Sequence, residues 1–399
     1  MRSKLERARE RERKKRKKKM EDRHSLETTN QNLSPRKKKT PTSKKPSLPK
    51  TQTEFIAASP LLPSTGITLP QISSNLQEWI SLSKTLAKSL KFDSEDDRSS
   101  WSESQRSRVF HYYLPIFFWI RAQLEDKRES SSSGSSSSSC PLVVGIQAPQ
   151  GCGKTTLVAE LEELLAAVGL KAASVSVDDF YLTFGGQQKL ADEFKGNPLL
   201  ELRGNAGSHD LELGSKTLEK LVKGQENGKE ILLPRYDKSL HSGRGDRAPE
   251  SAWPSVSTPI DVVLFEGWML GFRPVGEEAA AAVSPHLPAV DNFLKEYGGA
   301  WDSWCDSWLM IRATNGPSCV YNWRLQAERQ LREATGGKGM TDEQVADFVD
   351  RFLPAYSAYL PGSAELGPPG SQKGKVLVVG VEDDRSLSRA QPGPPRGLA

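Results

Sequence analysis

Cysteine is scarce in this chain of 399 residues, and the spacing of the few cysteines excludes two common uses. They form no Cys-x-x-Cys pair and have no histidine pairing of the zinc type. Free thiols in a reducing compartment are therefore expected, rather than a disulfide framework or a zinc site. The four cysteines are Cys140, Cys152, Cys305 and Cys319.

Long apolar runs are also missing. The longest spans residues 109–120, is interrupted by His111 and Pro115, and falls short of the roughly 20 residues that a membrane-spanning helix needs. No apolar stretch of the signal-peptide kind follows the first residues, and Glu6 and Glu10 are not typical of an organellar transit peptide. We therefore expect neither a membrane span nor a secretory leader.

Acidic residues are few only at the start of the chain. Residues 1–50 hold 20 Lys and Arg against 6 Asp and Glu, whereas the remainder holds 35 against 44. The formal net charge of +5 thus hides a later part with a net charge of −9. This acidic part does not favour a nucleic-acid-binding domain, although the basic tail alone could bind nucleic acid or another polyanion. Residues 1–72, basic and then rich in Ser, Thr and Pro, are predicted to be a disordered extension.

The stretch 141–156 joins an apolar run, a glycine-rich turn and an amphipathic segment. Residues 142–146 are predicted to form a buried strand, and residues 155–168 carry apolar side chains at helical spacing. A glycine-rich turn between strand and helix is typical of a phosphate-binding loop, whose backbone N–H groups face a polyphosphate. Lys154 would reach the β- and γ-phosphates of ATP, and the Thr155 hydroxyl would bind Mg²⁺. The predicted nucleotide-binding residues are Gly151, Cys152, Gly153, Lys154, Thr155 and Thr156.

One position departs from the usual G-x-x-x-x-G-K-[ST] pattern. Ala148 stands at the place of the first glycine, while Gly151 and Gly153 keep glycine where the backbone would approach phosphate. A chance glycine-rich turn is the alternative, which the strand–loop–helix context disfavours.

Four further apolar segments alternate with helical patterns, which indicates a doubly wound, mostly parallel α/β sheet. A five-stranded P-loop kinase domain is predicted at residues 141–384, after an N-terminal helical layer at 73–129 and a Ser-rich linker at 130–140, and before a disordered tail at 385–399. The further strands are expected at residues 172–177, 259–265, 307–312 and 375–381, and the principal helices at 76–90, 103–126, 321–333 and 341–359.

Carboxylates follow the second and third predicted strands, on the ligand side of such a sheet. Asp178 could accept the proton of a substrate hydroxyl, and Glu266 could bind Mg²⁺ directly or through water. Helix capping is the alternative for Asp178 and for its neighbour Asp179. Glu266 could instead be a carboxylate at the start of a helix.

Two polar loops, at residues 203–210 and 234–247, separate the second and third strands. Arginine is the natural bidentate partner of a carboxylate, so these loops predict an acidic acceptor substrate, with solvated turns as the alternative. Arginines on the helix after the fourth strand either close over ATP as a lid or form its solvent face. The candidate substrate-binding residues are Arg203, His209, Tyr236, Arg244 and Arg247, and the candidate lid residues are Arg324 and Arg329, with Arg332 beside them.

Several motifs together resemble the plant-type D-glycerate 3-kinases, which are related to phosphoribulokinases, uridine kinases and pantothenate kinases. The resemblance spans roughly residues 75–384 and implies strand order 2-3-1-4-5, with Asp178 as the catalytic base. It is carried by the phosphate loop and by residues 176–182, 203–210, 242–247, 265–272, 321–328 and 352–356.

The resemblance implies an enzyme that uses ATP and Mg²⁺ to phosphorylate the 3-hydroxyl of D-glycerate, the glycerate kinase reaction of photorespiration. It also implies a chloroplast location, with the cytoplasm as the alternative because the N-terminus is not transit-like. A kinase of another small alcohol, such as a nucleoside or pantothenate, is the second hypothesis. The third is a non-catalytic NTP-binding protein that works through its basic tail.

Overall fold

The computed structural model describes residues 51–92, 98–132, 140–334, 336 and 339–398. The basic start of the predicted extension and most of the Ser-rich linker lie outside these described residues. No helix in the described part of the chain is long and apolar enough to cross a membrane.

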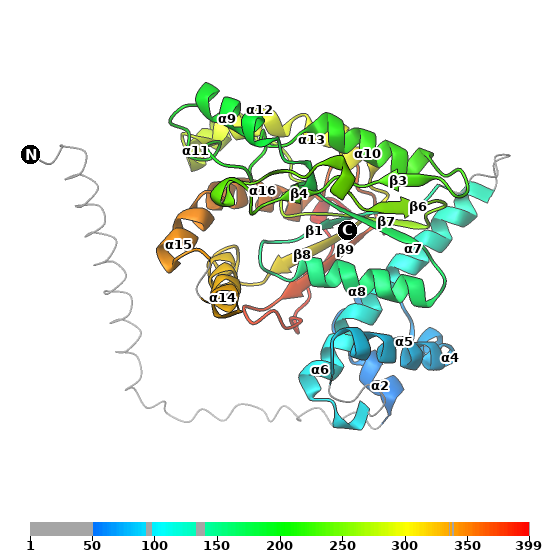
Figure 1. The fold of residues 1–399 in the computed structure, drawn as a ribbon. Helices are drawn as coiled ribbons and strands as arrows, with labels where there is room; N and C mark the ends of the chain where they lie inside the picture. The colour runs from blue at the N-terminus through cyan, green and yellow to red at the C-terminus, as the bar shows by residue number, and fades with distance from the viewer. Residues whose placement is uncertain (1–50, 93–97, 133–139, 335, 337–338, 399) are drawn as a thin grey trace, which may run out of the picture. The chain divides into compact units, whose positions relative to one another are not determined.

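A five-stranded parallel sheet forms the centre of the fold (Figure 1). Its order, β2-β7-β1-β8-β9, confirms the predicted 2-3-1-4-5 arrangement. Four of the strands are buried along most of their length because helices cover both faces, which is why they read as nearly continuous apolar runs. The strands are β1 (Leu142–Gln147), β2 (Ala172–Ser176), β7 (Val262–Gly267), β8 (Ser307–Ala313) and β9 (Val376–Val381).

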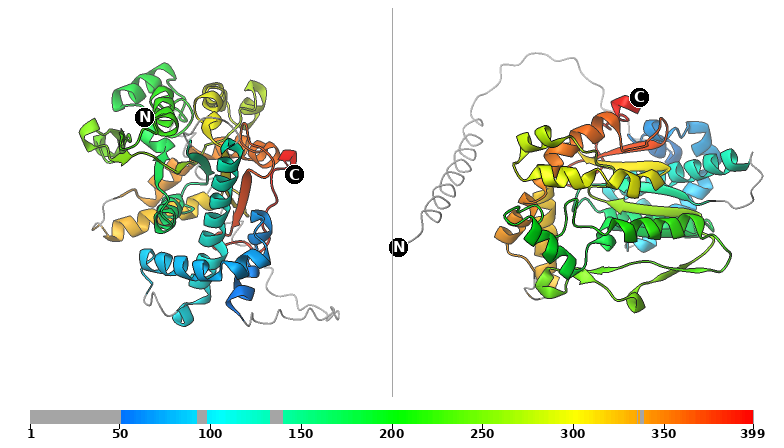
Figure 2. Two further views of the ribbon diagram at one scale, coloured as in Figure 1. Left: turned by 90° about the vertical axis from the view of Figure 1, so that its right-hand side faces the viewer. Right: turned by 90° about the horizontal axis from the view of Figure 1, so that it is seen from above.

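Helices form a layer on each side of the sheet (Figures 1 and 2). On one side, α8 packs against α5 and α7, so the N-terminal helices belong to the same unit as the sheet. The helices are α2 (Gln52–Ala57), α3 (Leu62–Thr65), α4 (Leu69–Ser74), α5 (Leu76–Ser89), α6 (Glu103–Ser107), α7 (Leu114–Ser132), α8 (Lys154–Ala167), α9 (Phe184–Glu193), α10 (Leu211–Lys223), α11 (Glu277–Val283), α12 (Leu287–Leu294), α13 (Tyr297–Ala300), α14 (Cys319–Ala334), α15 (Asp342–Asp350) and α16 (Leu353–Leu366).

Two short antiparallel ribbons lie within the long connection between β2 and β7. One pairs β3 (Glu230–Leu232) with β6 (Ser255–Ser257), and the other pairs β4 (Tyr236–Asp237) with β5 (Asp246–Arg247). The second ribbon positions the predicted substrate loop at residues 234–247.

The N-terminal boundary differs from the prediction, because helices begin at residue 52 rather than near residue 73. Thr51 caps α2 through a capping box with Glu54, and Ile56 is fully buried. The Ser/Thr/Pro-rich composition concealed these few apolar anchors and the residues that cap the short helices.

The C-terminal boundary also differs, since the predicted disordered tail at residues 385–399 is packed as far as it is described. Leu387 forms a bridge with Val381 at the end of β9, and the amide of Ser388 donates to the carbonyl of Gly380 over 2.9 Å. These backbone contacts cover the end of an edge strand, which an exposed tail would leave unpaired.

Two predicted helices are interrupted at prolines. Residues 103–126 divide into α6, a π-helical turn (Arg108–Tyr113) and α7, and residues 341–359 divide into α15 and α16. Pro115 has no N–H for the carbonyl of His111, which instead accepts a hydrogen bond from the Ser59 hydroxyl over 3.1 Å. Pro354 lies in the first turn of α16, where its missing N–H breaks no helical bond.

Gly145 provides a test of packing in the central strand. A Cβ atom at this position would approach Cε3 of Trp308 to 2.6 Å and Cys305 Sγ to 3.0 Å. We expect Gly145→Ala to lower the free energy of unfolding by about 1–3 kcal/mol, because the buried Trp308 ring has no room to move. Urea denaturation measures the change.

Gly185→Ala is the matched control, since its added Cβ meets nothing within 4 Å at the start of α9. It should leave the unfolding free energy within about 0.5 kcal/mol or raise it. Equal losses in the two variants would contradict the packing argument.

Candidate active site

The phosphate loop leaves β1 and enters α8 as predicted. Gly151 and Gly153 have φ angles of +80° and +97°, a conformation that side chains disfavour. A Cβ on Gly151 would also come within 2.8 Å of the Cβ of Trp323 in α14. Ala148, which replaces the first glycine of the usual pattern, is fully buried and its φ is not positive. The fold therefore does not require glycine at this position.

The loop presents its backbone and its hydroxyl side chains rather than its thiol. Thr155 and Thr156 are exposed in the first turn of α8, where N–H groups have no partners within the helix. Cys152 is buried, and burial raises the pKa of its thiol. Its backbone amide donates to the carbonyl of Pro149 over 3.3 Å. The Lys154 ammonium lies 3.5 Å from the carbonyl of Pro149.

Asp178 lies in a 3₁₀ turn (Val177–Phe180) directly after β2. The Tyr181 hydroxyl donates to its Oδ1 over 2.8 Å, and the Lys238 ammonium pairs with its Oδ2 over 2.6 Å. Burial raises the pKa of Asp178, but Lys238 and Tyr181 outweigh it and, with Lys154, lower the pKa to about 2. The carboxylate is therefore ionised and lies close enough to Lys154 to feel its charge.

Capping falls to the neighbours of Asp178. The Ser176 hydroxyl accepts from the Asp178 amide, and the Asp179 carboxylate accepts from the Ser176 amide. Asp179 also pairs with Arg235 over 3.4 Å. The capping alternative therefore describes Asp179, and the side chain of Asp178 is left for other contacts.

Glu266 lies at the end of β7, paired in register with Ile146 of β1 and Ser176 of β2. Burial raises its pKa, while the nearby Lys154 lowers it. Its Oε2 is buried without a hydrogen-bond partner among the described residues. An orphaned carboxylate oxygen close enough to Lys154 to feel its charge fits a hard cation. Across the described ranges no three His, Cys, Asp or Glu form a metal-ligand group.

The arginines of the two polar loops differ in their partners. Arg247 forms an ion pair with Asp210 over 2.8 Å and donates to the carbonyl of Tyr181, so it ties the loops together. Arg203 and Arg244 have no carboxylate partner within the described part of the chain. The structure thus separates two candidate anion-binding arginines from one that already has a structural partner.

Aromatic rings position these two free guanidinium groups. Arg203 lies 6.0 Å from the ring centre of Tyr181 and 5.5 Å from that of Tyr236, and it donates to the carbonyls of Gly243 and Arg244. The guanidinium of Arg244 lies 5.1 Å from the ring centre of Phe184. Tyr236 therefore supports Arg203, a role that differs from the direct substrate contact predicted for it.

His209 is buried, and its ring stacks on Tyr181 with the ring centres 4.6 Å apart. The Gly207 amide donates to the Tyr297 hydroxyl, which is therefore free to donate its own proton to Nδ1 of His209 over 2.8 Å. Burial lowers the pKa of His209 to about 3, so the ring is neutral. Its remaining hydrogen is then on Nε2, which is buried and has no partner among the described atoms.

The lid candidates form contacts between α14 and α15. Arg329 and Arg332 both pair with Asp342, over 2.7 Å and 2.6 Å. Arg324 pairs with Glu328, and its guanidinium lies 5.1 Å from the ring centre of Phe348. Of the three, Arg324 has a buried Nε without a partner.

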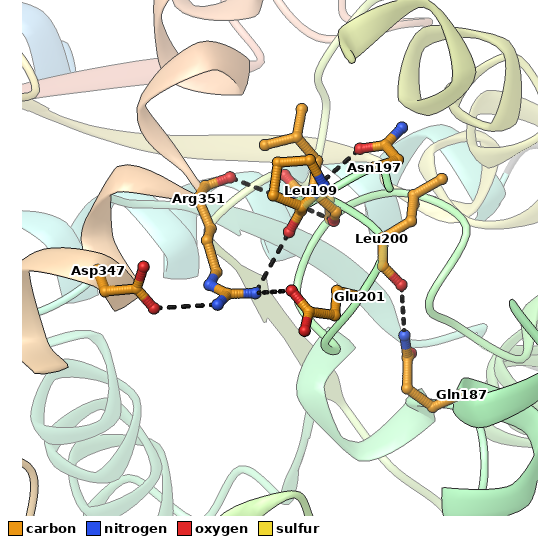
Figure 3. A network of polar contacts seen from close by, with 9 residues as sticks. Gln187, Asn197, Leu199, Leu200, Glu201, Asp347 and Arg351 are labelled. Carbon is orange, nitrogen blue, oxygen red and sulfur yellow. Dashed lines mark hydrogen bonds and ion pairs between the residues drawn. The ribbon is translucent and has the colours of Figure 1, made fainter. Parts of the chain in front are cut away.

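Arg351 links the corner between α15 and α16 to the segment that leads into the first polar loop (Figure 3). It pairs with Asp347 over 3.0 Å and with Glu201 over 3.1 Å. Its carbonyl accepts from the Asn205 amide group over 3.0 Å. The loop that carries Arg203 and His209 is thus anchored to the helices next to the phosphate loop.

Sequence reasoning missed Lys238 and Arg385. Lys238 lies in the second polar loop, but only the folded structure pairs it with Asp178. Arg385 belongs to the segment expected to be disordered, yet its Nε donates to the carbonyl of Gly151 over 2.7 Å. The only feature of the sequence that could have indicated a role for Arg385 is its position just after the last strand, at the edge of the sheet where ligands bind.

Comparison with known proteins agrees with this geometry. Residues 143–273 match the phosphoribulokinase/uridine kinase family. The chain is 44% identical over 333 residues to a chloroplastic D-glycerate 3-kinase of Arabidopsis thaliana, covering 84% of this chain and 71% of the relative. It is 36% identical to a probable ATP-dependent kinase of Saccharomyces cerevisiae, covering 62% and 87%.

A solved structure of a D-glycerate 3-kinase from Cryptococcus neoformans matches with a TM-score of 0.60 and 35% identity, covering 69% of this chain and 97% of that one. The phosphate loop at the end of β1, the strand order and these relatives lead to one assignment: the chain is a kinase and belongs to the D-glycerate 3-kinase family, within the phosphoribulokinase/uridine kinase group.

Proposed function

We propose that this kinase transfers the γ-phosphoryl group of ATP to the 3-hydroxyl of D-glycerate, giving 3-phospho-D-glycerate and ADP. The observation that carries the proposal is the presence of two arginines without carboxylate partners, Arg203 and Arg244, in the loops around an ionised Asp178. The names of the relatives from Arabidopsis thaliana and Cryptococcus neoformans support the same substrate.

The acceptor is held by its carboxylate. Arg203 and Arg244 supply guanidinium donors for this group, and the Nε2–H of His209 supplies a further neutral donor from a buried position. Stacking on Tyr181 and the hydrogen bond with Tyr297 fix the orientation of the His209 ring, and therefore the direction in which its Nε2–H group points. Fixed donors at different points around a small hydroxy acid provide the means to distinguish D- from L-glycerate.

Asp178 orients the 3-hydroxyl and accepts its proton late in the transfer. A carboxylate with a pKa near 2 is a weak base, so early deprotonation of an alcohol is not its role. In a loose phosphoryl-transfer transition state little proton transfer is needed before the P–O bond forms, and alignment of the hydroxyl matters more. Lys238, now paired with Asp178, is also close enough to offset negative charge that develops there.

The loop amides, Lys154 and the hydroxyls of Thr155 and Thr156 bind the phosphates of ATP. Thr155 and Glu266 are the residues that would hold Mg²⁺, which when bound neutralises charge on the β- and γ-phosphates. Arg324 and Arg329 are both paired, with Glu328 and Asp342, but Arg324 is the stronger lid candidate because its buried Nε has no partner among the described residues.

We infer that the reaction serves photorespiration in the chloroplast, with a cytoplasmic location as the alternative. The word chloroplastic in the name of the Arabidopsis thaliana relative supports the first location. Residues 1–50, where a targeting segment would be sought, lie outside the described residues.

Turnover of a substrate panel tests the proposal. ADP release should be at least about tenfold faster with D-glycerate than with L-glycerate, uridine or pantothenate at equal concentration, because the proposed site holds the carboxylate on the arginines while the 3-hydroxyl of the D-isomer lies at Asp178. NMR of the product should identify the 3-phospho isomer. Faster turnover of uridine or pantothenate would favour another small-alcohol kinase instead.

The pairing of Lys238 with Asp178 predicts a change in pH dependence. Lys238→Met removes the main influence that lowers the pKa of Asp178, so that burial, which raises the pKa, is opposed only by Tyr181 and Lys154. The carboxylate acts in its ionised form, so activity is lost as the pH falls through the raised pKa. We expect kcat/KM of the variant, relative to wild type, to be about twofold or more lower at pH 4.5 than at pH 7.5.

Asp178→Asn provides the comparison, because it cannot titrate and should lower kcat about 10²- to 10⁴-fold at every pH. Adding Lys238→Met to this variant should introduce no new pH dependence. A variant-to-wild-type ratio that is constant across the pH range would separate Lys238 from the ionisation of Asp178.

The arginine assignment predicts selective effects on glycerate. Arg203→Met and Arg244→Met should each raise the glycerate KM or lower kcat/KM about ten- to a hundred-fold, since each removes a charged donor, while the KM for ATP stays nearly constant. Arg247→Met is the control, because its partner is Asp210 and its loss should appear mainly as a lower Tm. Equal glycerate defects in all three variants would refute the distinction.

A further inference from the structure

A cavity of about 350 Å³ lies between the C-terminal end of β8 and helix α16. None of the residues around it belongs to the set assigned to phosphate, Mg²⁺ or glycerate. Most of its walls are apolar, formed by Ala313, Pro317, Leu360, Pro361 and Ala364. Its volume falls in the lower part of the range of small-ligand sites, which are roughly 300–1,000 Å³ and mainly apolar with a few polar groups.

One charged side chain, Arg312, lines this apolar cavity. Its Nη2 donates to the carbonyl of Ser363 over 2.9 Å and lies 3.9 Å from Sδ of Met310. No carboxylate pairs with it in the described part of the chain, and burial lowers its pKa. Its Nε and Nη1 have no protein acceptor among those residues, so the guanidinium retains donors for an anion.

Helix α16 adds a polar residue and a proline to the wall of the same cavity. Pro361 lies inside this helix and has no N–H, so the carbonyl of Ser357 lacks the usual donor four residues later. Ser357 and Pro361 both line the cavity. The walls therefore offer a cation, the polar residue Ser357 and apolar surface.

We propose that this cavity is a second ligand site, which binds a small organic carboxylate with an apolar body. The carboxylate pairs with the free donors of Arg312, and the body packs against Leu360, Pro361 and Pro317. Inorganic phosphate fits less well, because one guanidinium in apolar surroundings does not replace the hydration of a dianion.

Tyr356 connects the cavity with the phosphate loop. Its side chain belongs to the cavity wall, and its hydroxyl accepts from the amide of Gln150 over 3.1 Å. The tyrosine is almost fully buried, so a ligand pressed against it changes the packing behind the loop. Tyr356 thus joins the cavity wall to the phosphate loop, and the residues that line the cavity include none of those assigned to ATP.

Binding of two model acids tests the proposal independently of kinase activity. Isothermal titration with benzoate and cyclohexanecarboxylate should give Kd values below about 10 mM for the wild-type protein, and benzamide should bind at least tenfold more weakly than benzoate. Arg312→Met should weaken benzoate binding about tenfold or more. Leu360→Trp, which keeps Arg312 but fills the cavity, should abolish it.

Arg273→Met is the matched control. Arg273 also donates to backbone carbonyls just after α16, those of Gly367 and Pro368, but does not line the cavity. It should leave benzoate binding unchanged. The proposal is overturned if neither acid binds wild type, if Leu360→Trp binds as well as wild type, if benzamide binds as tightly as benzoate, or if a non-hydrolysable ATP analogue displaces benzoate competitively.

Discussion

The site depends on one constraint in the phosphate loop. The backbone amides near Lys154 must face the ligand, while Gly151 and Gln150 are held in place by contacts with the rest of the protein. Glycine at residue 151 lets the loop approach the Cβ of Trp323 in α14, and the carbonyl of the same glycine accepts a hydrogen bond from Arg385. The amide of Gln150 donates to Tyr356 in α16. Three elements from the C-terminal third of the chain thus hold a loop formed in its first half, which leaves the amides near Lys154 available to a polyphosphate.

The charged side chains around this loop are of two kinds, those that already have a partner within the protein and those that do not. Arg247 is paired with Asp210, and Asp179 is paired with Arg235, so both stabilise the loops. Arg203 and the orphaned Oε2 of Glu266 are held by the fold with unused hydrogen-bonding capacity. A binding site needs donors and acceptors that have no partner and are already held in position. The free energy of ordering these side chains is then spent during folding and not when the ligand binds.

Much of the architecture could be predicted from the sequence, because buried parallel strands are visible as apolar runs and the phosphate loop has a glycine pattern tied to its backbone geometry. The short N-terminal helices were missed, since α2 depends on a capping box and a few buried side chains rather than on composition. The partners of Lys238 and Arg247 were not predictable, because ion pairs across loops depend on spatial positions that residue spacing does not encode. The same limit applies to His209, whose neutral form follows from its burial against Tyr297.

The hydrogen bond between Arg385 and Gly151 joins residues 234 positions apart in the chain. Strand β9, which precedes Arg385, is also the last strand added to the sheet. During synthesis the phosphate loop is therefore made well before Arg385, so the contact that supports the outer side of the loop can form only after β9 has been made.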